Sequence, residues 1–270
     1  MTRFPTLFLS HGAPTLAIDG SPAHHFLREL GSRLGAPAGI VVFSAHHDAR
    51  PVTVTSSAAP RTWHDFGGFS PSLNAIRYPA PGDPRLASNI VSRLERAGIP
   101  AKQDASRGLD HGAWVPLHLM YPAGAVPVVQ VAIDARRDTQ WHEAQGSVLA
   151  PLREDGVLLI GSGSATHDLG SFFGAPQPLD AAAPEWVTAF SEWLAVKLEA
   201  GDRDAVRHAV TQGPFGRRNH PTPEHLLPLY VALGAAGDAA RAKRLHHSTA
   251  HAVLAMDMYA FGAPEHLLTA

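Results

Sequence analysis

The sequence predicts an α/β fold, with one domain built on a mostly parallel, mixed central sheet flanked by helices. Three observations support this prediction. Short apolar runs such as Ile40–Phe43 are typical of strands buried on both faces. These runs alternate with segments of helical periodicity, as in βαβ units. Several runs end in histidine, and chemistry in open α/β sheets gathers at the carboxyl ends of the strands. We therefore expect a metal site at the C-terminal edge of the strands.

The expected elements follow one another without an internal repeat or a linker. Each helix is assigned from apolar residues at helical spacing, and each strand from an unbroken apolar run. The expected strands are Phe4–Leu9, Ile40–Phe43, Val52–Thr55, Val126–Ile133, Val157–Ile160 and a last one within Ala252–Tyr259. The expected helices run from Ser21-Pro22 to Leu34, from Asp83-Pro84 to Gly98, over Val115–Tyr121, His142–Leu152 and Pro184–Glu199, and onward from Pro223. His111, which follows Asp110 and lies between Gly108 and Gly112, is expected in a loop.

Composition describes an ordinary globular chain. The 270 residues are 45% hydrophobic and 17% charged, with a formal net charge of -2, and we expect a single domain over residues 1–270. The absence of long charge runs argues against nucleic acid or an anionic membrane as the partner. No segment approaches the ~20 apolar residues of a membrane span, and no signal peptide is evident. A cytoplasmic location is the default expectation, and the oligomeric state is unreadable.

Histidine is the unusual residue, with 17 copies and no cysteine. A transition metal would therefore have to use imidazole and carboxylate ligands. A single histidine is more often a satisfied hydrogen-bonding group than a ligand, so placement must select the candidates. Those at strand ends or in loops framed by glycine or proline are His11, His46, His111, His167 and His225. A catalytic metal takes three protein ligands, which His11, His46 and His225 can supply, leaving His111 and His167 for proton transfer.

Residues beside these candidates suggest a surrounding shell. His47, His64 and His220 each neighbour a candidate and are possible pocket-lining groups. Asp48, Asp110 and Asp168 are expected to orient the adjacent imidazoles. The aromatic, glycine-rich loop Trp63–Phe69 suits either a pocket wall or a packed surface loop. Gly161-Ser162-Gly163 permits close backbone approach to a ligand but lacks the pattern of a phosphate-binding loop.

Five ordered motif blocks resemble one known family. LSHGAPT, VVFSAHHD, GLDHGAWVPLHLMYP with VPVVQVAI, GSGSATHDL and HPTPEHLLPL are similar, in order, to blocks of the class III extradiol ring-cleavage dioxygenases. The bacterial branch similar to plant DOPA 4,5-dioxygenase resembles the chain most. The resemblance runs from about Leu7 to Leu229 and extends to Phe261-Gly262.

The resemblance implies a function and a ligand set. It implies one divalent metal held by His11, His46 and His225, with His167 as catalytic base or further ligand. It also implies that His111 assists in substrate binding or proton transfer, and Trp114 and Ser164 are further candidate substrate-binding residues. The implied substrates are a small, DOPA-like aromatic diol and O2, with Fe(II) for activity or Zn(II) as in some relatives.

Three points stay open at the level of sequence. Non-haem Fe(II) oxygenases commonly use two histidines and a carboxylate, so Glu224 competes with His225 as the third ligand. His47 and Asp168 stand where tryptophan and asparagine are common in this branch, which bears on substrate range. The alternative functions are a zinc hydrolase on a similar scaffold and a non-catalytic metal-binding protein.

Overall fold

The computed structural model describes residues 3–262, and within them an eight-stranded sheet forms the centre of the molecule. Its strand order is β4-β3-β5-β2-β6-β1-β10-β7, and a separate two-stranded ladder pairs β8 with β9. The strands are β1 (Thr6–Ser10), β2 (Gly39–Asp48), β3 (Val52–Thr55), β4 (Ala101–Asp104), β5 (Val128–Ile133), β6 (Val157–Gly163), β7 (Ala242–His246), β8 (Thr249–Ala250), β9 (Leu254–Ala255) and β10 (Met258–Phe261).

The middle of the sheet is parallel and its flanks are mixed. β2 pairs in parallel with β5 and β6, and β6 pairs in parallel with β1. β10 is antiparallel to both β1 and β7, and β3 is antiparallel to β5. The predicted single α/β domain with a mostly parallel, mixed sheet is therefore confirmed. The carboxyl ends of β1, β2 and β6 meet at one edge.

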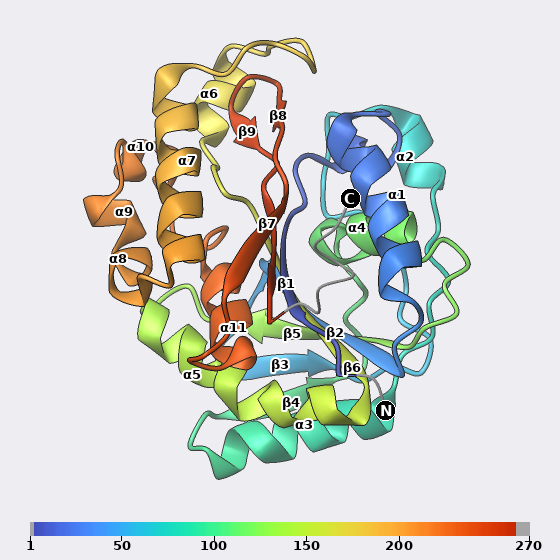
Figure 1. Cartoon of the computed structure of the whole chain (residues 1–270). Helices are drawn as coiled ribbons and strands as arrows, with labels where there is room; N and C mark the ends of the chain where they lie inside the picture. The colour runs from blue at the N-terminus through green and yellow to red at the C-terminus, as the bar shows by residue number, and fades with distance from the viewer. Residues whose placement is uncertain (1–2, 263–270) are drawn as a thin grey trace.

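Helices cover both faces of this sheet (Figure 1). The longer ones are α1 (Pro22–Leu34), α3 (Pro84–Arg96), α4 (His111–Met120), α5 (Thr139–Leu149), α7 (Glu185–Ala200) and α11 (Leu227–Ala236). The short ones are η1 (Pro14–Ala17), α2 (Pro71–Ala75), η2 (Ala150–Asp155), α6 (Leu169–Gly174), α8 (Arg203–Arg207), α9 (Ala209–Gln212) and α10 (Gly216–Asn219). Among the described residues, no helix combines the length and apolarity that a membrane crossing requires.

Strand alternation divides the hydrophobic core into two layers. In β1, Leu7 and Leu9 pack with α1 and α4, whereas Phe8 packs with the layer that contains α3, α5 and α11. Successive side chains of a strand point to opposite faces, so an apolar run without polar interruption fills both layers. β1, β2, β5 and β6 are buried on both faces, and for this reason they appear in the sequence as continuous apolar runs.

Two strands that the sequence did not predict form the edges of the sheet. β4 and β7 are the outermost strands, with the sequences AKQD and AKRLH. Edge strands commonly carry lysine and arginine, which oppose pairing with other chains, so they lack the apolar run of a central strand. The predicted last strand is displaced as well, because only its final residues enter the sheet, in β10.

The helix expected over His142–Leu152 runs from Thr139 to Leu149, and two further wrong boundaries concern candidate site residues. His111 is the first residue of α4, since the Asp110 carboxylate caps the helix by accepting a hydrogen bond from the Ala113 N–H; aspartate is a strong N-cap. α11 begins at Leu227, after His225. The Pro223 carbonyl first accepts hydrogen bonds from Leu226 N and Leu227 N in a turn.

Candidate metal and active site

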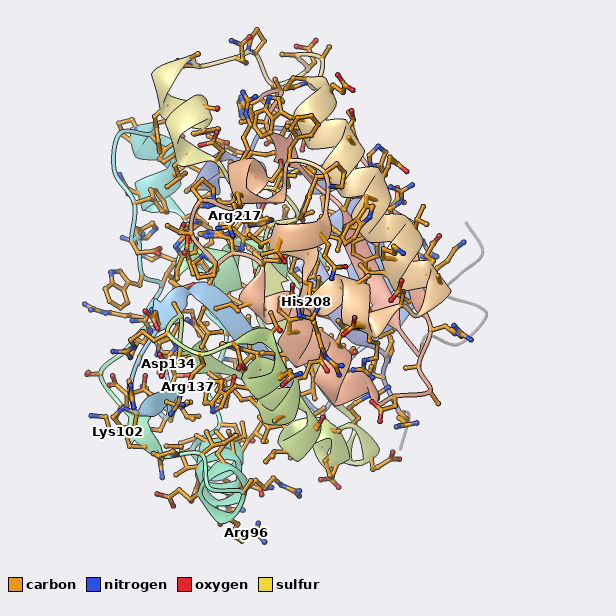
Figure 2. All side chains as sticks on the ribbon, turned by 90° about the vertical axis from the view of Figure 1, so that its left-hand side faces the viewer. Arg96, Lys102, Asp134, Arg137, His208 and Arg217 are labelled. Atoms are coloured by element: carbon orange, nitrogen blue, oxygen red, sulfur yellow. The ribbon has the colours of Figure 1, made fainter. Side chains whose placement is uncertain are left out.

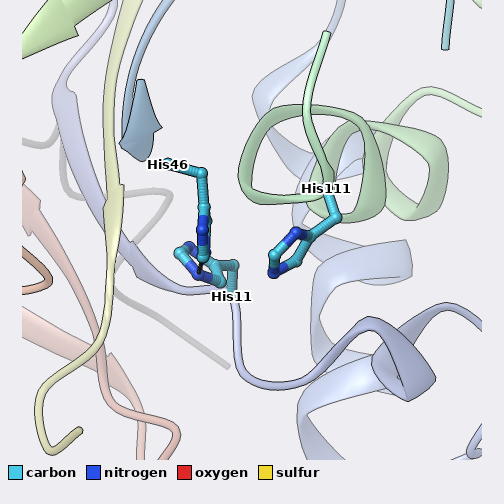
Figure 3. Close-up of side chains that lie close together, drawn as sticks. All are labelled: His11, His46 and His111. Carbon is cyan, nitrogen blue, oxygen red and sulfur yellow. Dashed lines mark hydrogen bonds between the residues drawn. The ribbon is translucent and has the colours of Figure 1, made fainter. Parts of the chain in front are cut away.

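Three imidazoles meet where the strands end. His11 follows β1, His46 lies near the end of β2, and His225 precedes α11. The Nε2 atom of His46 lies 3.1 Å from Nε2 of His11 and 3.3 Å from Nε2 of His225. Figure 3 shows the His11 and His46 rings beside that of His111, which enters from the start of α4. His11, His46 and His111 offer ring nitrogens that all lie within 4.8 Å of one another.

A chain of hydrogen bonds fixes the tautomer of His11. Pro116 has no N–H, so the carbonyl of Gly112, four residues earlier in α4, lacks its usual helical donor. The Ser162 hydroxyl donates to this carbonyl instead. With its only hydrogen committed, Ser162 Oγ must accept from Nδ1 of His11, 3.0 Å away. Nε2 of His11 therefore carries a lone pair.

Glu224 fixes the tautomer of His225 in the same way. Its Nδ1 lies 3.0 Å from Oε1 of Glu224, and a carboxylate only accepts, so Nδ1 carries the hydrogen and Nε2 the lone pair. The backbone carbonyl of His225 accepts from Ser164 N at 2.8 Å. This close approach requires a glycine at 163, because a Cβ there would lie 2.1 Å from the His225 carbonyl oxygen.

This nitrogen cluster fits a metal ion. His46 can place at most one hydrogen on Nε2, so it cannot satisfy the lone pairs of both His11 and His225. Ligands about 2.1 Å from one ion lie roughly 3.0–3.4 Å apart for angles between octahedral and tetrahedral, and the two measured separations are 3.1 and 3.3 Å. Burial lowers the pKa of His46 to about 4 and holds those of His11 and His225 well below the usual value, so these three imidazoles are neutral near pH 7.

Two more histidines lie against this cluster. The His167 ring stacks on His225 with a centroid separation of 3.3 Å and an interplanar angle of 10°. Its Nδ1 is buried without a hydrogen-bond partner, and burial lowers the pKa of His167 to about 4. The His111 ring centroid lies 4.0 Å from that of His46. The five histidines selected from sequence therefore gather in one place.

The cluster opens into a cavity of about 390 Å³ with an aromatic wall. Phe66 and Phe69 come from the glycine-rich loop, whose pocket-wall interpretation is thereby supported over a surface loop. Phe172 and Phe173 come from α6, and Phe173 is 61% exposed at the rim. A flat apolar ring can pack between these side chains while polar groups on one edge face the histidines.

Comparison with known proteins agrees with this geometry. The sequence profile described as the catalytic LigB subunit of aromatic ring-opening dioxygenase matches residues 5–262. The chain belongs to this family. It is accordingly an enzyme of the extradiol aromatic ring-opening dioxygenase class, as the five motif blocks predicted.

Individual relatives match this LigB-family enzyme over most of its length. A Beta vulgaris protein named 4,5-DOPA dioxygenase extradiol is 41% identical over 260 residues, which cover 95% of this chain and 96% of the relative. An Escherichia coli K12 protein of the same name is 39% identical over 241 residues, covering 87% and 86%. A crystal structure of an uncharacterized Escherichia coli K12 protein superposes with a TM-score of 0.78 at 32% identity and covers 96% and 100%.

Some predicted residues of the LigB-family enzyme lie away from the cavity. Trp114 is fully buried behind Phe66, and the buried Ser164 hydroxyl donates to the Thr166 carbonyl, so neither lines the cavity. His47 points away from His46, as strand alternation requires, and lies 2.6 Å from Thr53 Oγ1. His64 and His220 face the carbonyls of Ile76 and Ala165 instead of the cavity.

The three aspartates expected to orient imidazoles have other partners. Asp110 caps α4 and accepts from Ser44, Arg107 and Gln130. Asp168 caps α6, and Asp48 accepts from Ala135 N. Adjacency in sequence misled for Asp110 and Asp168, because capping turns a carboxylate toward the backbone of its own helix.

The orienting groups that the sequence reasoning missed are Asp65 and Ser162. Asp65 accepts from His111, and Ser162 accepts from His11. The sequence suggests Glu224 only as a competing ligand, whereas its Oε1 lies 3.0 Å from Nδ1 of His225. The sequence does contain a clue to Asp65, because this residue lies inside the aromatic loop Trp63–Phe69, a candidate pocket wall.

A second cavity, of about 450 Å³, has a different character. Arg137 and His208, on its rim, are labelled in Figure 2. Its charged groups are paired: Arg207 binds Glu143 through two hydrogen bonds, and Arg137 lies 3.9 Å from Asp134. The histidine cavity therefore differs from the second cavity, because several buried or partly buried histidines line it.

Proposed function

We propose that this enzyme is a metal-dependent extradiol dioxygenase that opens the ring of a catechol-type, DOPA-like substrate with O2. The observation that carries the proposal is that Nε2 of His46, in the wall of an aromatic cavity, lies 3.1 Å from Nε2 of His11 and 3.3 Å from Nε2 of His225. His11, His46 and His225 are the proposed ligands. The position of Glu224 on the outer edge of His225 supports His225 over Glu224 as the third ligand.

Bound Fe(II) would supply the redox chemistry by which a singlet diol and triplet O2 react. The protein supplies position and proton transfer. Phe66 and Phe69 pack against the flat faces of the substrate ring and exclude water from it. His167 and His111 lie at the histidine edge, placed to take protons from the diol hydroxyls. Neutral His167 follows from its burial, which lowers its pKa to about 4.

The deciding experiment is O2 uptake by anaerobically purified, Fe(II)-loaded protein given a panel of catechols, DOPA included. Uptake with a yellow ring-opened product is expected with iron and not with zinc. Three imidazoles are also the ligand set of catalytic zinc, so zinc-loaded protein tested anaerobically against hydrolase substrates is the second arm. Absence of uptake with every catechol at stoichiometric iron would reject the proposal.

His167→Ala tests the proposed base. Turnover should be abolished while the metal stays bound, because His11, His46 and His225 remain. His208→Ala, an exposed histidine in the second cavity, is the matched control. Full turnover in His167→Ala would remove this residue from the reaction.

A further inference from the structure

Asp65 contacts His111 twice with one oxygen. Its Oδ1 lies 2.9 Å from the backbone N of His111 and 2.9 Å from Nδ1 of the same residue. The other oxygen, Oδ2, lies 3.8 Å from Nδ1 of His46. The side chain is only 16% exposed and lines the histidine cavity. The carboxylate is therefore placed between a proposed ligand and a proposed proton acceptor.

This double contact determines which nitrogen of His111 carries the hydrogen. An ionised carboxylate only accepts hydrogen bonds, so Nδ1 of neutral His111 must be the donor and Nε2 must carry the lone pair. Oδ1 also accepts the backbone N–H of His111 at 2.9 Å, so this oxygen acts as an acceptor in both contacts.

The contact also fixes the direction of the ring. The backbone N–H of His111 is one of the free donors at the start of α4, so Asp65 ties the imidazole and the helix end to the same atom. Phe66 meets the ring edge-on, with centroids 5.7 Å apart at 89°. These contacts leave the His111 imidazole ring little freedom to rotate.

We propose that Asp65 is a positioning residue that holds His111 as the Nδ1-protonated tautomer, with the Nε2 lone pair available to a substrate hydroxyl. The kinetic part of this inference rests on the proposed function. Glu224 provides an internal comparison, because it holds His225 in the same tautomer 3.0 Å away. Asp65 accepts a hydrogen bond from a proposed proton acceptor and Glu224 accepts one from a proposed ligand. Their contacts with His46 and His167 are longer, at 3.8 and 3.9 Å, so Asp65 should act mainly on kcat and Glu224 mainly on metal affinity.

The kinetic test compares Asp65→Ala with Asp65→Asn. Alanine removes the acceptor and should lower kcat about 10- to 100-fold with iron still bound. Asparagine keeps an acceptor oxygen in place and should recover most of that loss. Glu224→Gln should instead weaken metal binding about 10- to 100-fold. Asp83→Ala, which removes a carboxylate that accepts two backbone N–H groups at the start of α3, is the control for lost capping.

A double-mutant cycle shows whether Asp65 acts through His111. In a His111→Ala background, Asp65→Ala should change kcat by less than about twofold, because its partner is already absent. An equal loss in both backgrounds would overturn the proposal. So would an Asp65→Ala enzyme whose kcat stays within about twofold of the wild type.

A readout independent of turnover separates this inference from the proposed function. In zinc-loaded protein labelled with ¹⁵N-histidine, the Nε2 signal of His111 should be that of an unprotonated nitrogen, and Asp65→Ala should remove this preference. A protonated Nε2 in the wild type would overturn the inference even if catechols are turned over. Failure to turn over any catechol would reject the proposed function and leave the tautomer result standing.

Discussion

The hydroxyl oxygen of Ser162 lies 3.0 Å from Nδ1 of His11 and donates its own hydrogen to the Gly112 carbonyl. One serine thus links β6, α4 and the segment after β1. The direction of both hydrogen bonds follows from the single hydrogen of the hydroxyl. The lone pair on Nε2 of His11 is therefore set by a residue that does not face the cavity.

Ser162→Ala should lower metal affinity about 10- to 100-fold, because Nδ1 of His11 loses its acceptor and the ring loses its fixed tautomer. Competition with a chromophoric chelator measures the change. Ser147→Ala is the matched control, since that hydroxyl also donates to backbone carbonyls but lies between α5 and α11. Equal affinity in Ser162→Ala and wild type would contradict the assigned tautomer.

Pro116→Ala should weaken metal binding less than Ser162→Ala does. The new N–H at position 116 competes with Ser162 for the Gly112 carbonyl, but that oxygen has two lone pairs and can accept both hydrogens. The same chelator competition measures the effect. A loss larger than that of Ser162→Ala would point to a rearrangement of α4 instead.

Gly163→Ala should lower the free energy of unfolding by about 1–3 kcal/mol, which is the usual cost of overpacking a core. The added Cβ would lie 2.1 Å from the His225 carbonyl oxygen and 3.2 Å from the Phe8 ring. Metal binding should weaken too, because His225 must shift. Urea unfolding of metal-free protein measures the first effect. Gly174→Ala, whose Cβ meets nothing within 4 Å, should remain close to the wild type.

Metal-free protein should lose stability as the pH falls from about 6.5 toward 5. Burial lowers the pKa of His46, His167 and His220 to about 4 in the folded state. The unfolded chain, with ordinary histidines, then binds more protons, so stability is present above pH 6.5 and is lost as the pH falls, by up to about 1.4 kcal/mol per unit for each group.

His47 offers a way to isolate one contribution to this slope. Burial lowers the pKa of His47 to about 3, and this residue points away from the cavity. His47→Gln should retain the contact with Thr53 and flatten the pH dependence by about one proton. Urea unfolding in chelator at three pH values measures the slope. An unchanged slope would mean that His47 is not buried as a neutral group.

The parts of the fold that sequence predicts are those with a strong local signal. β1, β2, β5 and β6 are buried on both faces and show as apolar runs, and the caps Ser21 and Asp83 mark the starts of their helices. β4 and β7 escape prediction because the ends of a sheet are polar. The start of α4 was misplaced because glycine beside His111 outweighed the capping aspartate.

The candidate site also has a part that the sequence predicts and a part that it does not. Its histidines were predictable, because each follows a strand or stands in a framed loop and strand ends converge. Its orienting groups were not, since Asp65 lies 46 residues from His111 and Ser162 lies 151 residues from His11. Such contacts depend on which strands are neighbours, and the sequence order does not state the order of strands in the sheet.

The proposed ligands are spread along almost the whole chain. His46 follows His11 by 35 residues, and His225 follows His46 by 179. An ion held by all three would cross-link the segment after the first strand to a segment far later in the chain, so a nascent chain cannot complete the site until His225 has left the ribosome. Binding then counts as folding energy, about 2.7 kcal/mol at a free metal concentration 100 times Kd. Metal supply would thus affect the stability of the folded enzyme as well as its rate.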